Sequence, residues 1–250
     1  MNSNCSLALL AAGCGMLAAL PAVAAAPAAE HCPAAKESYP PLADPKLDVL
    51  NFAELKRTAD RGNANALALL GLKYTGVEGD AGGVAPDMKK AVALFQKSAA
   101  KSDPLGEYLL AVAYLSGSGV DKDEARAFSW FKRAGEHGHA NGLYWTGEMT
   151  AKGRGGVTAS WEKALPIFTA AAAVGAGDAF VELGFMYEKG LGGLAVDYAK
   201  SAYCYRQGGQ LKSQLAQYNL RLLIDTGHTA WQPGDPGEAP KKAPEPYRVK

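Results

Sequence analysis

Apolar and polar residues recur along most of the chain with the spacing of short helices that bury one face. The stretch from Leu105 to His139 shows the pattern most clearly, because apolar side chains there lie three to four residues apart. Gly117 and Gly119 interrupt this spacing, an acidic run at 121–124 restarts it, and glycines at 135 and 138 end it. The stretch therefore predicts two amphipathic helices joined by a turn.

The same unit recurs through the chain. Its second-helix aromatic residue appears at Phe95, Phe131, Phe168 and Tyr205, at intervals of 36, 37 and 37 residues. A two-helix unit with one apolar face cannot bury that face alone, so copies must stack beside one another. The spacing predicts an array of helix pairs.

Several positions of the unit repeat a pattern of glycine, tyrosine and alanine. One copy has Leu70, Gly71 and Tyr74 in its first helix, and the next has Leu110 and Tyr114. These residues resemble the Sel-one-like repeats, which are relatives of the tetratricopeptide repeats. The resemblance implies an all-α, right-handed superhelical solenoid of antiparallel helix pairs, with about four repeats and half-repeat caps.

The resemblance also sets the predicted boundaries. We expect a signal peptide at 1–28, a proline-containing linker at 29–48, the solenoid at 49–228 and a disordered proline-rich tail at 229–250. Within the solenoid the repeats are predicted at 64–103, 104–139, 140–176 and 177–212, with a capping half-repeat at 213–228. A helix from Leu50 to Arg61 is expected to cover the other end, and the glycine-rich loop 76–86 to be a mobile insertion.

The first 28 residues carry no charged side chain and contain an apolar, alanine-rich stretch. This is typical of a secretory signal, and the small residues at 26–28 predict cleavage after Ala28. The protein is then expected in the periplasm or outside the cell. Two alternatives stay open: an uncleaved membrane anchor, and a lipoprotein anchored at Cys14.

Two of the four cysteines, Cys32 and Cys204, follow the predicted signal. Cys204 falls in a slot that apolar residues fill in the other copies, which favours a buried thiol. An oxidising compartment would allow a disulfide with Cys32. The sequence leaves open whether the two are joined.

Charge and motifs give little support for other classes of function. With 26 basic and 25 acidic residues, and no basic run, the chain lacks the signature of a nucleic-acid binder. His137 and His139 are too few ligands for a zinc site, and we expect them in an exposed loop. We predict no metal and no cofactor.

Serines at 98 and 160 each begin an S-x-x-K motif, the nucleophile motif of penicillin-recognising enzymes. The companion motifs of those enzymes are missing. Ser98 falls at the end of a second helix, and Ser160 precedes a helix that it is expected to cap. We therefore predict no catalytic residues, and a penicillin-binding hydrolase remains a poor alternative.

First helices of stacked pairs line the concave side, where partners usually bind. Trp145 stands where the family tends to have a polar residue. It is either an anchor for a partner or a packing residue that compensates for Thr150, which replaces a tyrosine. The predicted partner-binding residues on this face are Glu107, Trp145, Glu148, Phe180, Glu182 and Phe185.

The resemblance implies a non-enzymatic scaffold or adaptor that binds another protein. One form would be an immunity protein that neutralises a phospholipase effector of type VI secretion, as exported members of the family do. An envelope assembly or regulatory scaffold is the alternative. The sequence names neither the partner nor the oligomeric state.

Overall fold

The computed structural model describes residues 30–36, 43–76, 85–232 and 235 of the chain. Over these residues it contains eleven helices and no strand, which confirms the predicted all-α class. The helices are α1 (Pro45–Asp48), α2 (Phe52–Asp60), α3 (Ala64–Thr75), α4 (Met88–Ala99), α5 (Pro104–Ser116), α6 (Glu124–Glu136), α7 (Ala140–Lys152), α8 (Trp161–Ala173), α9 (Gly177–Lys189), α10 (Tyr198–Gln210) and α11 (Gln214–Asp225).

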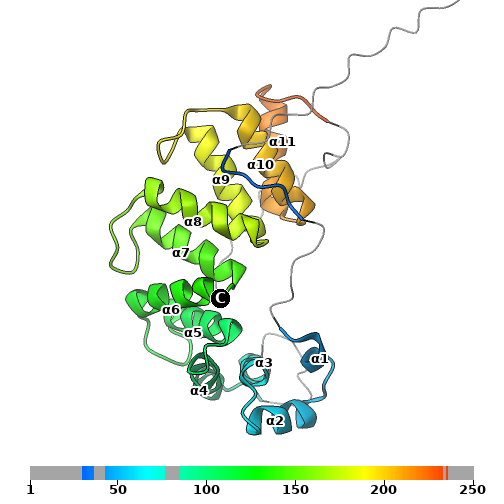
Figure 1. Cartoon of the computed structure of the whole chain (residues 1–250), viewed down its shortest axis with the longest axis vertical. Coiled ribbons are helices and arrows are strands. Elements are labelled where there is room, and N and C mark those ends of the chain that lie inside the picture. The colour runs from blue at the N-terminus through cyan, green and yellow to red at the C-terminus, as the bar shows by residue number, and fades with distance from the viewer. Residues whose placement is uncertain (1–29, 37–42, 77–84, 233–234, 236–250) are drawn as a thin grey trace, which may run out of the picture.

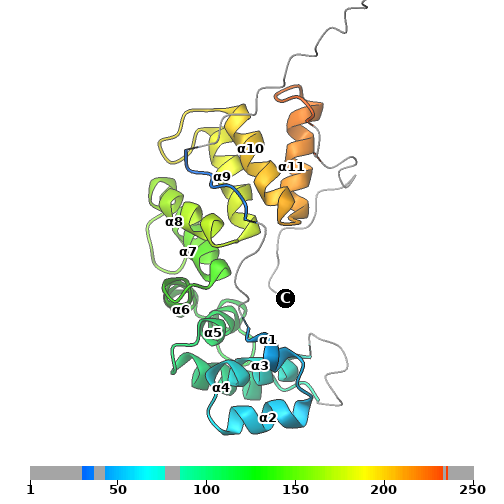
Figure 2. The ribbon, with the colours of Figure 1, turned by 45° about the vertical axis from the view of Figure 1, so that its right-hand side comes forward.

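Consecutive helices pair into four hairpins, α3 with α4, α5 with α6, α7 with α8, and α9 with α10 (Figure 1). Helix α2 packs on α3 at one end of the array, and α11 packs on α10 at the other. Each hairpin also contacts the next, so the apolar faces are buried between neighbours. The array bends into an arc, with α6 and α8 on its outer side and α5 and α11 nearer its open side (Figure 2).

Polar side chains begin the helices where the sequence placed them. Asp87, Asp123, Ser160 and Asp197 each accept a hydrogen bond from the backbone amide three residues on, which satisfies a free donor of the first turn. The predicted capping role of Ser160 is thus confirmed. First helices end at a glycine in the left-handed region, as at Gly117 with φ 75°.

The repeated aromatic residue packs on the repeated glycine of its partner helix. A Cβ added to Gly184 would lie 2.4 Å from the Tyr205 ring, and one added to Gly71 would lie 2.5 Å from Phe95. The two helices of a pair can approach this closely only because the glycine has no side chain. The 36- and 37-residue intervals in the sequence therefore mark one packing position per repeat.

The structure differs from the predicted linker at two places. Residues 45–48 form the short helix α1, and Leu47 there is buried. Residues 30–36, which we call the leader, pack against the far end of the array beside α8, α9 and α10 (Figure 1). The rest of the linker is outside the described residues.

The predicted tail also begins with an ordered contact. Asp235 pairs with Arg206 of α10, with 2.7 Å between Oδ1 and Nε, and the two side chains are 3% and 12% exposed. The predicted signal 1–28, residues 77–84 of the first loop and residues 236–250 lie outside the described residues. None of the helices in the described ranges is long and apolar enough to span a membrane.

Candidate interaction surface

Helices α7 and α9, the first helices of two neighbouring pairs, together carry a cluster of acidic side chains. We define the acidic patch as Tyr144 and Glu148 of α7 with Asp178 and Glu182 of α9. Lys152, one turn beyond Glu148 on α7, is the basic group that interacts with Glu182 at this place. The charges of Glu148, Asp178 and Lys152 thus all act on Glu182.

Glu148 is 7% exposed, and its charge acts on both Tyr144 and Glu182. Its Oε1 forms an ion pair with Lys152, one helical turn away. Its Oε2 is buried and has no hydrogen-bond partner among the residues that the structure describes. A carboxylate oxygen in this position retains unused capacity to accept a charge-assisted hydrogen bond.

These neighbours change the pKa of Glu182. Burial and, to a smaller extent, the negative charges of Glu148 and Asp178 raise its pKa to about 7, while the positive charge of Lys152 acts in the opposite direction. Burial also raises the pKa of Asp178. Both shifts report carboxylates that have lost water without gaining enough positive charge. The acidic patch is therefore suited to receive a cation.

The cation is better supplied by a partner side chain than by a metal ion. In the part of the chain that the structure describes, no three histidine, cysteine or acidic side chains lie together as metal ligands. A guanidinium or ammonium group needs only one or two carboxylates.

Two of the residues predicted for partner binding, Glu148 and Glu182, come together in the acidic patch. Phe185, also on α9, is half-buried, and its ring lies 6.0 Å from that of Trp161 on α8. The sequence reasoning missed Tyr144, Asp178 and Lys152. Their spacing of three or four residues from the predicted positions on the same helices was the available signal.

Trp145 is a packing residue here. It is 8% exposed and stacks on Phe131 with 5.6 Å between ring centroids and 15° between planes. Phe131 belongs to α6 of the preceding pair. The tryptophan thus helps to join α7 to α6.

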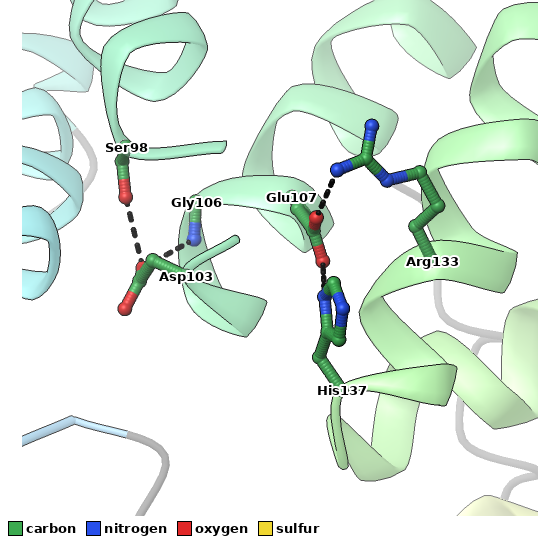
Figure 3. Close-up of polar contacts among 6 residues, drawn as sticks. All are labelled: Ser98, Asp103, Gly106, Glu107, Arg133 and His137. Carbon is green, nitrogen blue, oxygen red and sulfur yellow. Dashed lines mark hydrogen bonds and ion pairs between the residues drawn. The ribbon is translucent and has the colours of Figure 1, made fainter. Parts of the chain in front are cut away.

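Glu107 and Phe180 offer no free surface to a partner. Glu107 is fully buried, and its two carboxylate oxygens meet Arg133 Nη2 at 3.0 Å and His137 Nδ1 at 2.7 Å (Figure 3). These contacts hold α5 to α6. Phe180 is fully buried in the apolar core. The interaction surface that we carry forward therefore excludes both residues.

Ser98 and His139, which the sequence singled out, both lie inside the array. Ser98 Oγ lies 2.9 Å from Asp103 Oδ2, which also accepts a hydrogen bond of 2.8 Å from the Gly106 amide (Figure 3). The serine thus supports the start of α5. His139, expected in an exposed loop, is 1% exposed and accepts the Gly142 amide hydrogen through Nδ1 at 3.2 Å.

Comparison with known families agrees with this architecture. The model of the Sel1 repeat matches residues 64–103, 104–139 and 179–213. The chain carries Sel1 repeats. The first two matched segments have the predicted boundaries, and the pair α7 and α8 lies between the second and the third. Sel1 repeats generally form scaffolds that mediate protein–protein interactions.

The chain is similar to several solved structures, and the first of these has the same fold. A Sel1 repeat protein from Oxalobacter formigenes is 23% identical, with a TM-score of 0.63, over 71% of this chain and 69% of that one. A protective antigen of uropathogenic Escherichia coli is 24% identical, with a TM-score of 0.43, over 72% and 52%. The immunity protein Pa5087 from Pseudomonas aeruginosa is 22% identical, with a TM-score of 0.48, over 75% and 74%. No curated protein matches the chain.

Proposed function

We propose that this Sel1 repeat protein is a non-enzymatic scaffold that binds a protein partner through the acidic patch. The observation that carries the proposal is the group of largely buried carboxylates on α7 and α9, where burial and the negative charge of Glu148 raise the pKa of Glu182. A basic side chain of the partner would supply positive charge to this group. Phe185, half-buried on the same helix α9, adds apolar area close by.

The energetics of the patch favour binding because the protein already bears the cost of desolvating these carboxylates. An incoming guanidinium group would lose its own hydration but would gain two or more charge-assisted hydrogen bonds. Removal of one member of such a desolvated charge pair typically weakens a complex by about 2 to 5 kcal/mol. The acidic patch is therefore a candidate for the energetic centre of the interface.

We also propose that the protein is exported to the periplasm, on the basis of the uncharged, apolar first 28 residues. In this compartment a narrower role is immunity, in which the inner wall of the array neutralises a phospholipase effector of type VI secretion. Support for this role comes from the resemblance to exported family members. A scaffold for envelope assembly or regulation is the alternative.

Binding measurements on a charge-neutralised variant test the proposal. We would isolate partners from periplasmic extract with the wild-type protein and measure the affinity of each purified partner by calorimetry. Glu148→Gln combined with Glu182→Gln should weaken binding at least tenfold and reduce its dependence on salt, with little change in thermal stability. Glu136→Gln is the matched control, because Glu136 forms only an exposed ion pair with Lys132 on α6.

Equal affinity of the wild-type and doubly substituted proteins would remove the acidic patch from the interface. If the purified partner is a phospholipase whose activity falls on addition of this protein, the immunity role is supported. If it is an envelope protein without such activity, the scaffold role is favoured. A covalent adduct with labelled penicillin that Ser160→Ala abolishes would contradict the non-enzymatic assignment.

A further inference from the structure

The leader docks on the array by specific polar contacts rather than by apolar packing alone. The His31 amide donates to Tyr187 Oη at 3.3 Å, and Thr169 Oγ1 donates to the His31 carbonyl oxygen at 3.1 Å. The Ala35 amide donates to Gln207 Oε1 at 2.8 Å. The three anchoring side chains belong to α8, α9 and α10, so the leader is held at a defined position on the last two full helix pairs.

This docking brings two cysteines into contact. Cys32 is 2% exposed in the leader, and Cys204 of α10 is fully buried. The two thiols lie close enough for Cys32 to raise the pKa of Cys204, and both are free in this structure. They belong to the same apolar core cluster as Phe168 and Tyr187.

The contact depends on features that distinguish the last pair from the others. When α10 and α6 are aligned on their repeated aromatic residues, Cys204 takes the position of Trp130 and Gln207 takes the position of Arg133. Arg133 stacks over the Trp130 ring at 4.6 Å and lines a shallow hollow beside α6. On α10 a small thiol and an amide acceptor take these places, which leaves room for the leader and supplies its hydrogen bond.

We propose that Cys32 and Cys204 form a disulfide bond that fastens the leader to α10. The proposal does not depend on the acidic patch or on the identity of a partner. Its basis is the burial of both thiols, their mutual contact and the three hydrogen bonds that fix the leader beside them. The bond would close a covalent ring around almost the whole repeat array.

The oxidation needs an electron acceptor, which is a disulfide of a thiol–disulfide oxidoreductase or glutathione disulfide. The Cys32 thiolate attacks one sulfur of the oxidant and releases the other as a thiolate, which gives a mixed disulfide at Cys32. Cys204 then loses its proton and attacks the Cys32 sulfur. The oxidant sulfur that was bound to Cys32 leaves as a thiolate. Two thiols become one disulfide, and two electrons and two protons pass to the oxidant.

Access decides the order of these steps. Burial raises the pKa of Cys204, and the neighbouring Cys32 thiol raises it further, so this sulfur stays protonated while the leader is docked. Cys32 lies on a short extended segment that can leave the surface without unfolding a helix. The first attack therefore takes place from the released leader, and redocking brings Cys204 to the mixed disulfide.

Peptide mapping tests the proposal directly. The full chain, reduced and then incubated with glutathione disulfide under native conditions, should yield a peptide pair linked through Cys32 and Cys204 after digestion without reductant. The oxidised protein should also melt several degrees above the reduced protein, and a reducing agent should abolish the difference. Cys32→Ala and Cys204→Ala should each remove both the linked peptides and the stabilisation.

Three results would overturn the proposal. The first is alkylation of both thiols in the denatured protein after oxidation, and the second is recovery of each as a separate glutathione adduct. The third is a link from either cysteine to Cys5 or Cys14 in place of the other. Cys32→Ala keeps the test valid if Cys204→Ala fails to fold, because Cys32 lies outside the helices.

Discussion

His139 shows how one buried side chain can make the stability of the array depend on pH. The imidazole caps α7 through Nδ1, stacks on Tyr108 at 4.2 Å and leaves its Nε2 buried without a partner. Burial lowers its pKa from 6.5 to about 4. Protonation would place a positive charge on a buried ring whose Nε2 has no hydrogen-bond acceptor among the described residues.

We predict that the folded state loses stability through this residue as the pH falls from about 6.5 to about 4. Because the folded pKa is below the unfolded value, the unfolded chain binds the proton first, and the cost reaches roughly 3 kcal/mol at pH 4. Urea unfolding of the wild type and of His139→Asn at pH 7 and pH 4 checks this. Asparagine keeps a capping side chain, so the variant should lack this part of the acid sensitivity. Parallel losses in the two proteins would contradict the assignment.

Residue-scale reasoning from the sequence was least successful for side chains whose neighbours come from another repeat. Trp145 was a candidate anchor for a partner, yet it stacks on Phe131 of the preceding repeat. The position of Phe180 along its helix fits a surface anchor and a core residue equally well, and the structure places it in the core. Which face a helix turns to its neighbour depends on stacking angles that a single sequence does not contain.

At the scale of the elements, the closeness of two helices depends on one missing side chain. Gly184 of α9 lies against the Tyr205 ring of α10, so an added methyl group has no space. Gly177 begins the same helix and is the matched control, because its nearest contact for an added Cβ would be an ordinary 3.7 Å.

We predict that Gly184→Ala destabilises the protein by about 1 to 3 kcal/mol, because overpacking outweighs the better helix propensity of alanine. Gly177→Ala should be neutral or slightly stabilising. Thermal or urea unfolding of both variants measures the difference. An increase in stability for Gly184→Ala would show that α9 and α10 can separate freely, contrary to this packing.

The helices themselves were largely predictable, because their determinants are local. Capping residues, glycine ends and a repeated aromatic placed the four pairs, and the family model matches the first two with the same boundaries. The acidic patch was half predictable: Glu148 and Glu182 were recognised on one face. Asp178 and Lys152 complete it, but their importance comes from desolvation, which has no signature in the sequence.

At the scale of the whole molecule, a repeat array should respond locally to a local perturbation, since each unit contacts only its neighbours. The leader is the exception, because it joins residues 138 to 172 positions apart. Loss of its anchors should therefore loosen the end of the array that lies beside α8, α9 and α10.

We predict that Thr169→Val combined with Gln207→Leu raises amide hydrogen exchange in the leader and in α8–α10, with no change in α3 and α4. Both substitutions keep the side-chain volume close to the original and remove the polar atoms that hold the leader. Exchange followed by mass spectrometry under reducing conditions measures the effect. Ser129→Ala on α6, whose hydroxyl bonds only within its own helix, is the control. A uniform rise over all helices would indicate a single cooperative unit instead.

The docked leader has a consequence for the order in which the protein is assembled. A ribosome makes this segment before any of the helices α1–α11, but its binding place is complete only after α10 has been made. The backbone groups of the leader therefore lack these hydrogen-bond partners until about 170 further residues have been added. The helix pairs can pack one after another as they are made, whereas the leader, which is made before them, docks last.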